Sequence, residues 1–229
     1  MSDSTGTFCR VLLHTRDVAA AVRFYRDVFG WEPACRLVLR EADYWIPYVG
    51  ADDVEASTNA AVRAGATLIE KARAVNEVGS SIFRDPDGAI FGVCSAFECP
   101  QPLMQERRPI WWIEVLTHRP DVLQTFYGPL FQWQFVEEPL APHPLYITCT
   151  RRDRPVGGML PIGPGWATAP RWQLLFAVDD LESSVEQVVR SGGRVEFGPI
   201  DVPAAGRLTS VRDPNGALFV LVQPHKRAT

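Results

Sequence analysis

An internal repeat constrains the fold of this chain more than any other feature of its 229 residues. Residues 45–95 and 172–223 share one order of features: an apolar strand, an Asp-Asp pair, an amphipathic helix that ends at glycine, and a last apolar strand behind an Asp-Pro-x-Gly turn. Trp45 and Trp172 lie 127 positions apart, and so do Gly65 and Gly192. A repeat of this length predicts two similarly folded units.

The segments before these stretches also correspond, but at a different offset. A strand at residues 8–15 and a helix at 18–29, capped by Asp17, are matched by a strand at 112–116 and a helix at 120–131. Trp31 and Trp133 are 102 positions apart, whereas Trp45 and Trp172 are 127 apart, so the first copy lacks 25 residues. In the second copy this segment has the pattern of a β-hairpin around the turn at 151–154.

These patterns predict an α+β fold of tandem βαβββ modules, in which curved mixed sheets each enclose a concave cavity. We expect one such domain at 1–98 that lacks one β-hairpin, a polar linker, and a complete domain of the same kind at 110–229. The strand edge left by the missing hairpin makes a homodimer an expectation as well.

Composition excludes several classes of partner. The net charge of −4 and the pI near 5.6 give no reason to expect a nucleic acid or an anionic membrane. The five cysteines are scattered and form no CxxC pair, which favours free thiols over disulfides or a zinc site. With no apolar run of membrane-spanning length and no leader pattern, we expect a cytoplasmic protein.

Three further motifs carry a resemblance to a known family. WIEV at 112–115, FYGPLFQW at 126–133 and RPVGGMLP at 154–161 occur in this order. Together with the repeat, they resemble the vicinal-oxygen-chelate superfamily, which contains glyoxalases, bleomycin-resistance proteins and extradiol dioxygenases. More narrowly, the chain looks like the two-domain glyoxalase-like proteins of actinomycetes. The resemblance covers nearly the whole chain and implies the fold, but this fold carries many different functions.

The resemblance also implies where a metal ion would be held. The corresponding positions here are Arg10 and Trp112, Ile46 and Gln173, Gly92 and Val220, and Gly157-Gly158. Of these, only Gln173 could coordinate an ion, and metal sites in proteins need about three protein ligands. We therefore expect no metal and no other cofactor.

Strand alternation predicts which residues line the cavity of the second domain. Trp112 and Glu114 should face it together with Gln173 and Val220. Burial would raise the pKa of Glu114 and suit it to proton transfer, so it is the candidate catalytic residue. The alternative is a structural glutamate paired with an arginine.

Further candidates for substrate binding lie outside these strands. His143, Tyr146 and Trp166 fall on the hairpin and the loop behind it, where they could cover a ligand or simply pack. Arg10 could bind an anionic group, although an internal salt bridge is the alternative. His14, near the end of its strand, is expected at the surface.

Two functions remain open. One is a metal-independent cyclase, isomerase or lyase of small-molecule, possibly secondary, metabolism, with Glu114 as acid and base and an aromatic or apolar substrate. The other is a protein that binds and sequesters an aromatic antibiotic or metabolite without turnover. An enzyme that uses metal through unorthodox ligands is the third and weakest reading.

Overall fold

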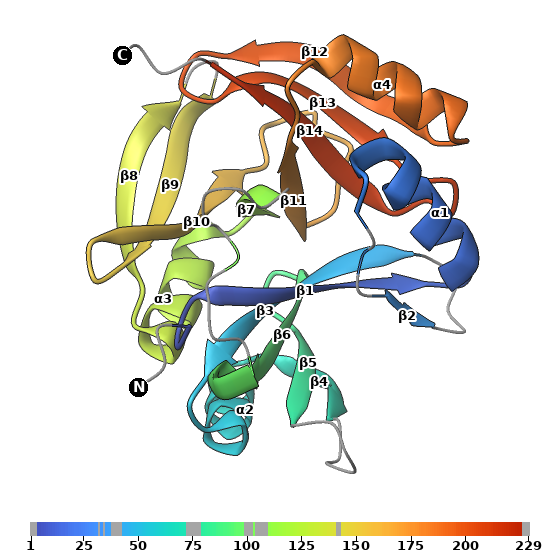
Figure 1. Cartoon of the computed structure of the whole chain (residues 1–229). Coiled ribbons are helices and arrows are strands. Elements are labelled where there is room, and N and C mark those ends of the chain that lie inside the picture. Colours follow the sequence, from blue (N-terminus) through green and yellow to red (C-terminus); the bar gives the residue numbers. More distant parts are fainter. Residues whose placement is uncertain are drawn as a thin grey trace.

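The computed structural model describes residues 4–31, 33, 35–37, 43–71, 79–98, 103, 110–140 and 143–225. Its N-terminal half forms a six-stranded sheet and its C-terminal half an eight-stranded sheet, both of mixed direction (Figure 1). The predicted linker lies outside the described residues except for Glu98 and Leu103; the Leu103 side chain is buried in the core. The α+β class and the βαβββ order are confirmed.

The bounds of the elements follow in chain order, first for the N-terminal half and then for the C-terminal half. The N-terminal half contains β1 (Phe8–Thr15), α1 (Val18–Phe29), β2 (Cys35–Leu37), β3 (Tyr44–Ala51), α2 (Val54–Arg63), β4 (Thr67–Lys71), β5 (Ser80–Arg84), β6 (Ile90–Ser95) and the short 3₁₀ helix Ala96–Glu98. The C-terminal half contains β7 (Ile110–Thr117), α3 (Pro120–Phe131), β8 (Gln134–Leu140), β9 (His143–Arg151), β10 (Arg154–Pro161), β11 (Arg171–Ala177), α4 (Leu181–Arg190), β12 (Arg194–Val202), β13 (Gly206–Arg212) and β14 (Leu218–Pro224).

Local sequence signals start and stop the helices as expected. The carboxylates of Asp17, Asp53 and Asp180 each accept a backbone N–H three residues further on, which caps α1, α2 and α4. Gly30 ends α1 in the left-handed region at φ 65°, where glycine carries no side-chain penalty. Helix α3 lacks a side-chain cap and begins instead at Pro120, whose ring fixes the first helical φ.

Register identifies the strands that the N-terminal half lacks. Its sheet has the order β2-β1-β3-β6-β5-β4, and the other has β12-β13-β14-β11-β7-β10-β9-β8. Strand β2 pairs in parallel with β1 through Leu13↔Cys35, as β10 pairs in parallel with β7 through Val115↔Met159. Only residues 30–34 separate α1 from β2, so the lost hairpin is the counterpart of β8 and β9. The predicted loss is confirmed, but β2 corresponds to β10, a strand that the sequence pattern had counted among those lost.

The first helix of each half packs against strands of the other half. Phe29 of α1 stacks on Phe176 of β11 at 5.1 Å, and the α1 residue Phe24 meets Phe219 of β14. In the opposite sense, Phe126 of α3 packs edge-on against Phe91 of β6 at 5.9 Å. A single hydrophobic core therefore runs through both halves.

Two buried hydrogen-bond bridges, related by the repeat, join the halves. The hydroxyl of Tyr127 in α3 donates to Asp85 in the Asp-Pro-Asp-Gly turn of the other half at 2.8 Å, and it accepts the indole N–H of Trp172 at 3.1 Å. The second bridge repeats this arrangement with Tyr25 of α1, Asp213 of the Asp-Pro-Asn-Gly turn and Trp45. The Asp carboxylates also accept backbone N–H groups inside their own turns, which confirms the prediction of turns.

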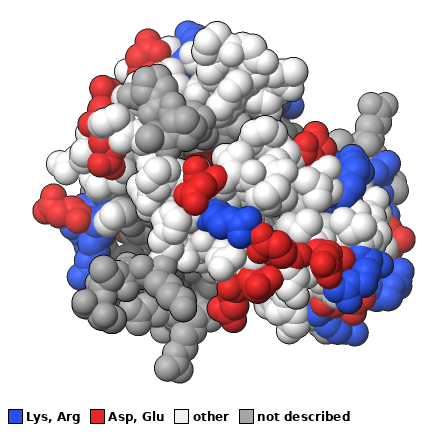
Figure 2. Space-filling view, turned by 90° about the horizontal axis from the view of Figure 1, so that it is seen from above, with Lys and Arg blue, Asp and Glu red and all other residues white. Residues whose placement is uncertain are grey.

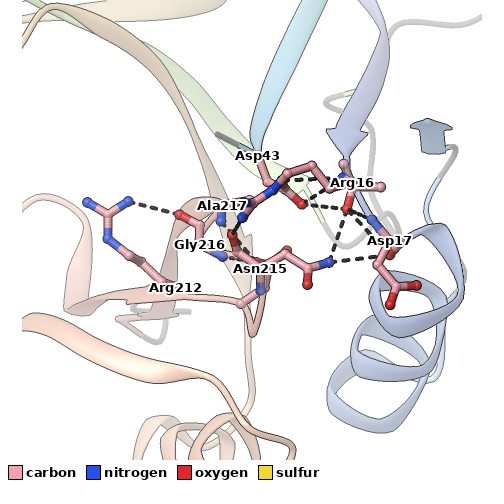
Figure 3. A network of polar contacts seen from close by, with 9 residues as sticks. Arg16, Asp17, Asp43, Arg212, Asn215, Gly216 and Ala217 are labelled. Atoms are coloured by element: carbon pink, nitrogen blue, oxygen red, sulfur yellow. Dashed lines mark hydrogen bonds and ion pairs between the residues drawn. The ribbon is translucent and has the colours of Figure 1, made fainter. Parts of the chain in front are cut away.

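A network at the edge of the core strengthens this junction (Figure 3). The guanidinium of Arg16 donates to the carbonyl of Asn215 at 2.9 Å and to the carboxylate of Asp43 at 2.8 Å. The Asn215 amide donates in turn to the Thr15 hydroxyl. At the equivalent position of the repeat, Thr117 donates to Asp87 of the other turn. Turns and strand ends of opposite halves are thus tied on both sides.

The surface over the C-terminal half mixes both signs of charge. Figure 2, which shows the molecule from above, has acidic and basic side chains interspersed on this face. Two of the exposed pairs are Arg207–Glu182 and Arg190–Glu186. Solvent screens such exposed pairs, so they contribute little to the free energy of unfolding, and the buried core and its bridges dominate stability.

We predict that Tyr127→Phe and Tyr25→Phe each lower the free energy of unfolding by about 1–3 kcal/mol, because each leaves a buried indole N–H and a buried carboxylate short of a partner. Urea denaturation followed by far-UV circular dichroism and by fluorescence would measure this, with both signals coinciding in one transition. Thr125→Ala, which removes an exposed hydroxyl from the same helix, should change the value by less than about 0.5 kcal/mol. Two separate transitions would contradict the shared core.

Candidate functional site

The eight-stranded sheet curves around a cavity of about 1030 Å³. Its floor is formed by β7, β10 and β11, and its rims by the two edge strands β8 and β12. The lining is mainly apolar and aromatic, with a few polar groups, as is usual for small-molecule sites. The residues that line it are Trp111, Trp112, Glu114, Leu116, Glu138, Pro139, Leu140, Tyr146, Thr148, Leu160, Trp166, Ala167, Thr168, Arg171, Gln173, Leu175, Glu196, Phe197, Ile200, Val202, Ala204, Ala205, Leu208, Ser210, Arg212, Leu218 and Val220.

Strand β7 supplies the floor through alternation of its side chains. Ile113 and Val115 point into the common core, whereas Trp112 and Glu114 line the cavity. Gln173 of β11 lies directly opposite Glu114 in the antiparallel pairing. The two side chains therefore meet on the same face of the sheet.

A directed chain of hydrogen bonds ends at the Glu114 carboxylate. The indole N–H of Trp112 donates to the hydroxyl of Tyr146 at 2.6 Å, and that hydroxyl donates to Glu114 Oε2 at 2.7 Å. The amide of Gln173 donates to Glu114 Oε1 at 2.7 Å. Because the indole can only donate, it turns the phenol proton towards the carboxylate. Each carboxylate oxygen keeps one further acceptor position for a ligand.

A glycine leaves room for the contact between Tyr146 and Glu114. Gly158 of β10 pairs with Glu114 in the parallel register. A Cβ atom at this position would overlap the hydroxyl group of Tyr146. The absence of a side chain therefore lets the phenol reach across β10 to the carboxylate.

Burial sets the protonation of these groups. Glu114 is only 7% exposed, and desolvation raises its pKa above the ordinary value of 4.5. The hydrogen bonds from Tyr146 and Gln173 and the charge of Arg171 act in the opposite direction on this pKa. Burial and the neighbouring Glu114 hold the pKa of Tyr146 well above its usual range. The site thus combines a carboxyl group of raised pKa with a phenol that keeps its proton.

The structure brings most of the predicted site residues together. Glu114, Trp112, Gln173, Tyr146, Trp166 and Val220 all line the cavity. The backbone of His143 lies in β9, but its side chain is outside the described residues. Sequence analysis missed Trp111, Phe197 and Arg171; the last could have been found, because it stands two residues before Gln173 and so shares its face of β11. The role of each residue in binding or catalysis stays a prediction.

The concave face of the N-terminal sheet differs from that of the C-terminal sheet in the side chains that lie on it. Arg10 lies there with its guanidinium 4.6 Å from the ring centre of Tyr48, and that ring packs where a side chain on Gly92 would be. Tyr48 belongs to a small cluster of buried side chains with Ile46 and Cys94. Arg10 is therefore remote from the described cavity, in a face that its own side chains fill.

The expectation that His14 lies at the surface is wrong. Its side chain is 2% exposed and its ring lies 5.4 Å from that of Tyr44. The reason is that β1 lies between β2 and β3, so even the end of this strand is covered.

The residues present do not fit the metal ion that related folds hold. At the positions implied by the resemblance, the C-terminal cavity offers the indole of Trp112, the amide of Gln173 and the isopropyl group of Val220. The Gln173 amide is bound to Glu114. In the part of the chain that the structure describes, no group of three or more His, Cys, Asp or Glu residues is arranged to hold an ion. Such a donor set is too small to replace the water around a divalent ion.

Comparisons with known proteins agree with this architecture. The family model described as "Bleomycin resistance protein-like N-terminal" matches residues 7–37. A Mycobacterium tuberculosis protein named as a glyoxylase, CFP32, is 29% identical over 96% of this chain and 95% of its own length. The anthracycline biosynthesis protein DnrV of Streptomyces peucetius is 28% identical over 92% of this chain and 90% of its own.

Solved structures show the same fold at lower identity. The Mn(II)-bound glyoxalase from Novosphingobium aromaticivorans superposes with a TM-score of 0.61 at 18% identity, covering 97% of this chain and 83% of that one. The 2,3-dioxygenase LapB from Pseudomonas sp. KL28 also gives 0.61, at 13% identity over 99% and 95% of the two chains.

The duplicated βαβββ modules and the cupped mixed sheet define a glyoxalase-like fold. The sequence matches and the fold together support similarity to the vicinal-oxygen-chelate superfamily. No helix in the described ranges is long and apolar enough to cross a lipid bilayer.

We predict that Glu114→Gln gains stability relative to the wild type as pH rises. The folded wild type binds the Glu114 proton more tightly than the unfolded chain, so this group's contribution is fully present below pH 4.5 and is lost as pH rises through the folded pKa. Within that window the difference in unfolding free energy should change by about 1.4 kcal/mol per pH unit. Urea denaturation of both proteins from pH 4 to 8 measures it.

The raised pKa values of Asp85 and Asp213 affect both proteins alike and cancel in this difference. A difference that stays constant across the range, or falls as pH rises, would contradict a buried Glu114 with a raised pKa.

Proposed function

We propose that the protein is a metal-independent enzyme of small-molecule metabolism, in which Glu114 moves a proton in a reaction of the cyclase, isomerase or lyase type. The observation that carries this proposal is the chain of donors from Trp112 through Tyr146 to a buried carboxylate on the floor of an apolar cavity. A structural glutamate needs no such cavity, and it would be expected to pair with an arginine. Among the described residues Glu114 has neutral hydrogen-bond donors instead.

The geometry favours general acid–base chemistry at this carboxyl group. Because burial raises its pKa and so makes it a stronger base than an exposed carboxylate, Glu114 can accept a proton from a bound substrate and return it at another atom. Tyr146 and Gln173 hold the carboxylate in one orientation throughout, since each fixes a different oxygen. Trp112 orients the phenol and offers a ring on which a flat substrate can lie.

The relatives support an aromatic ligand. DnrV and its Streptomyces counterpart DauV are named as anthracycline biosynthesis proteins, and anthracyclines contain a flat system of fused rings. A cavity of about 1030 Å³ lined by Trp111, Trp112 and Trp166 is large enough for several such rings.

The alternative function is sequestration of an aromatic antibiotic or metabolite. The match of residues 7–37 to a bleomycin-resistance-like model favours it, as does the apolar lining of the cavity. Ring stacking and shape would then supply the affinity, and Glu114 would be dispensable.

A comparison of Glu114→Gln with Glu137→Gln separates the two functions. Glu137 lies on β8 and binds Gln124 at the surface, so its loss serves as a matched control. With polycyclic aromatic ketones as substrates and products followed by mass spectrometry, we expect Glu114→Gln to lower turnover by about 10²–10⁴-fold with little change in affinity, and the control to keep turnover. Binding without any product from the wild type would favour sequestration.

A further inference from the structure

A second charged group in the cavity, Arg171, has no role in the hydrogen-bond chain of Glu114. It is the first residue of β11 and is half-buried among the lining residues. Side chains two residues apart on a strand share a face and lie about 7 Å apart, so Arg171 is one position along the floor from Gln173, the partner of Glu114. The cavity therefore holds a cation beside the candidate acid–base group.

The hydrogen bonds of this guanidinium go only to neutral groups. One Nη donates to the hydroxyl of Thr168 and the carbonyl of Ala169, both neutral groups of the loop over the cavity. Its Nε is buried and has no hydrogen-bond partner. The covered Nε stays unsatisfied, whereas the second Nη makes no hydrogen bond to the described residues and is the donor left for a ligand.

The carboxylates nearby are already engaged. Glu196 binds Arg212 through two hydrogen bonds, at 2.9 and 3.2 Å. Glu114 is bound by Tyr146 and Gln173. Among the residues that the structure describes, Arg171 forms no ion pair; burial and the charge of Arg212 lower its pKa, and the more distant charges of Glu196 and Glu114 offset this only in part. Arg171 is thus the cation in the lining that remains for a ligand.

We propose that Arg171 binds an oxyanion of the ligand, and that the substrate is an aromatic carbonyl compound with a removable proton on the carbon next to the carbonyl group. This inference rests on the proposed function of Glu114. A planar guanidinium is well suited to the task, because it donates through a fixed fork and stays charged when partly buried. Anionic aromatic acids should occupy the same position as competitive ligands.

Glu114 and Arg171 together accept the proton and the negative charge that the reaction step releases. The C–H bond next to the carbonyl breaks, its proton moves to a free acceptor position of Glu114, and the electron pair moves through the new C=C bond to the carbonyl oxygen. The resulting enolate oxygen pairs with Arg171. In a conjugated enolate, return of the proton from Glu114 to a different carbon gives an isomerisation. Attack of the enolate carbon on a second carbonyl forms a C–C bond and an alkoxide, which takes the proton back from Glu114, and gives a cyclisation. Positive charge placed where negative charge develops lowers the barrier.

Two ligands of the same shape test the oxyanion site directly. 2-Naphthoate carries a carboxylate, and 2-naphthamide is its neutral counterpart, so calorimetric titration with each isolates the effect of charge. We expect the wild type to bind 2-naphthoate about tenfold more tightly than the amide, and Arg171→Met to lose this preference while it still binds the amide. Arg190→Gln, which removes the same charge from the outer face of α4, should keep the preference.

A second pair of variants separates binding from a structural role of Arg171. Thr168→Val removes the loop contact but retains the guanidinium, so the preference for the anion should survive. Glu114→Gln should increase the preference, because it removes the competing negative charge.

The outcomes are distinct from those for the proposed function. Equal binding of acid and amide by the wild type, a preference that survives Arg171→Met, or no binding of either compound would overturn the oxyanion site. The first two results leave the acid–base role of Glu114 intact. Conversely, a preference that depends on Arg171 in a protein without turnover would support the oxyanion site and overturn the enzymatic proposal.

Discussion

The fold depends on two buried tyrosine hydroxyls, one in each half of the chain, that form hydrogen bonds with residues of both halves. Tyr127 and Tyr25 each accept an indole N–H and donate to the carboxylate of a turn in the opposite half. Neither a carboxylate nor an indole can be buried cheaply without its partner. The helix contacts and these bridges therefore join the two halves through one continuous core.

The two halves differ because the N-terminal half lacks one hairpin. In the C-terminal half, β8 and β9 extend the sheet far enough to form the second wall of a cavity. The N-terminal sheet lacks their counterparts, and its concave face is filled by its own side chains, with Tyr48 lying over Gly92. The cavity described above thus lies in the larger half of the chain.

Two ionisable groups in the cavity are buried at a cost in free energy. Burial of Glu114 and of the Arg171 guanidinium disfavours the charged form of both groups, and the structure compensates them only in part. Tyr146 can reach Glu114 because Gly158 leaves room, although glycine in a strand lowers stability. Such compromises are expected where binding or catalysis, and not packing, has shaped the residues.

Sequence patterns alone determined the local structure and much of the architecture. The bounds of β1, α1 and α3, the caps and turns, and the loss of a hairpin followed from periodicity and from the repeat, because these features depend on near neighbours in the chain. Alternation along β7 and β11 also placed Trp112, Glu114 and Gln173 on one face. The same rule applied one step further would have found Arg171.

Only the tertiary structure decided which segments meet. The exchange of α1 and α3 between the halves, the bridges from Tyr25 and Tyr127, and the burial of His14 all arise from contacts between residues far apart in the chain. The identity of the lost strands likewise came from pairing register, which a sequence repeat does not specify. Periodicity fixes which face of an element is apolar, but the partner that covers this face is selected by the packing of the whole chain.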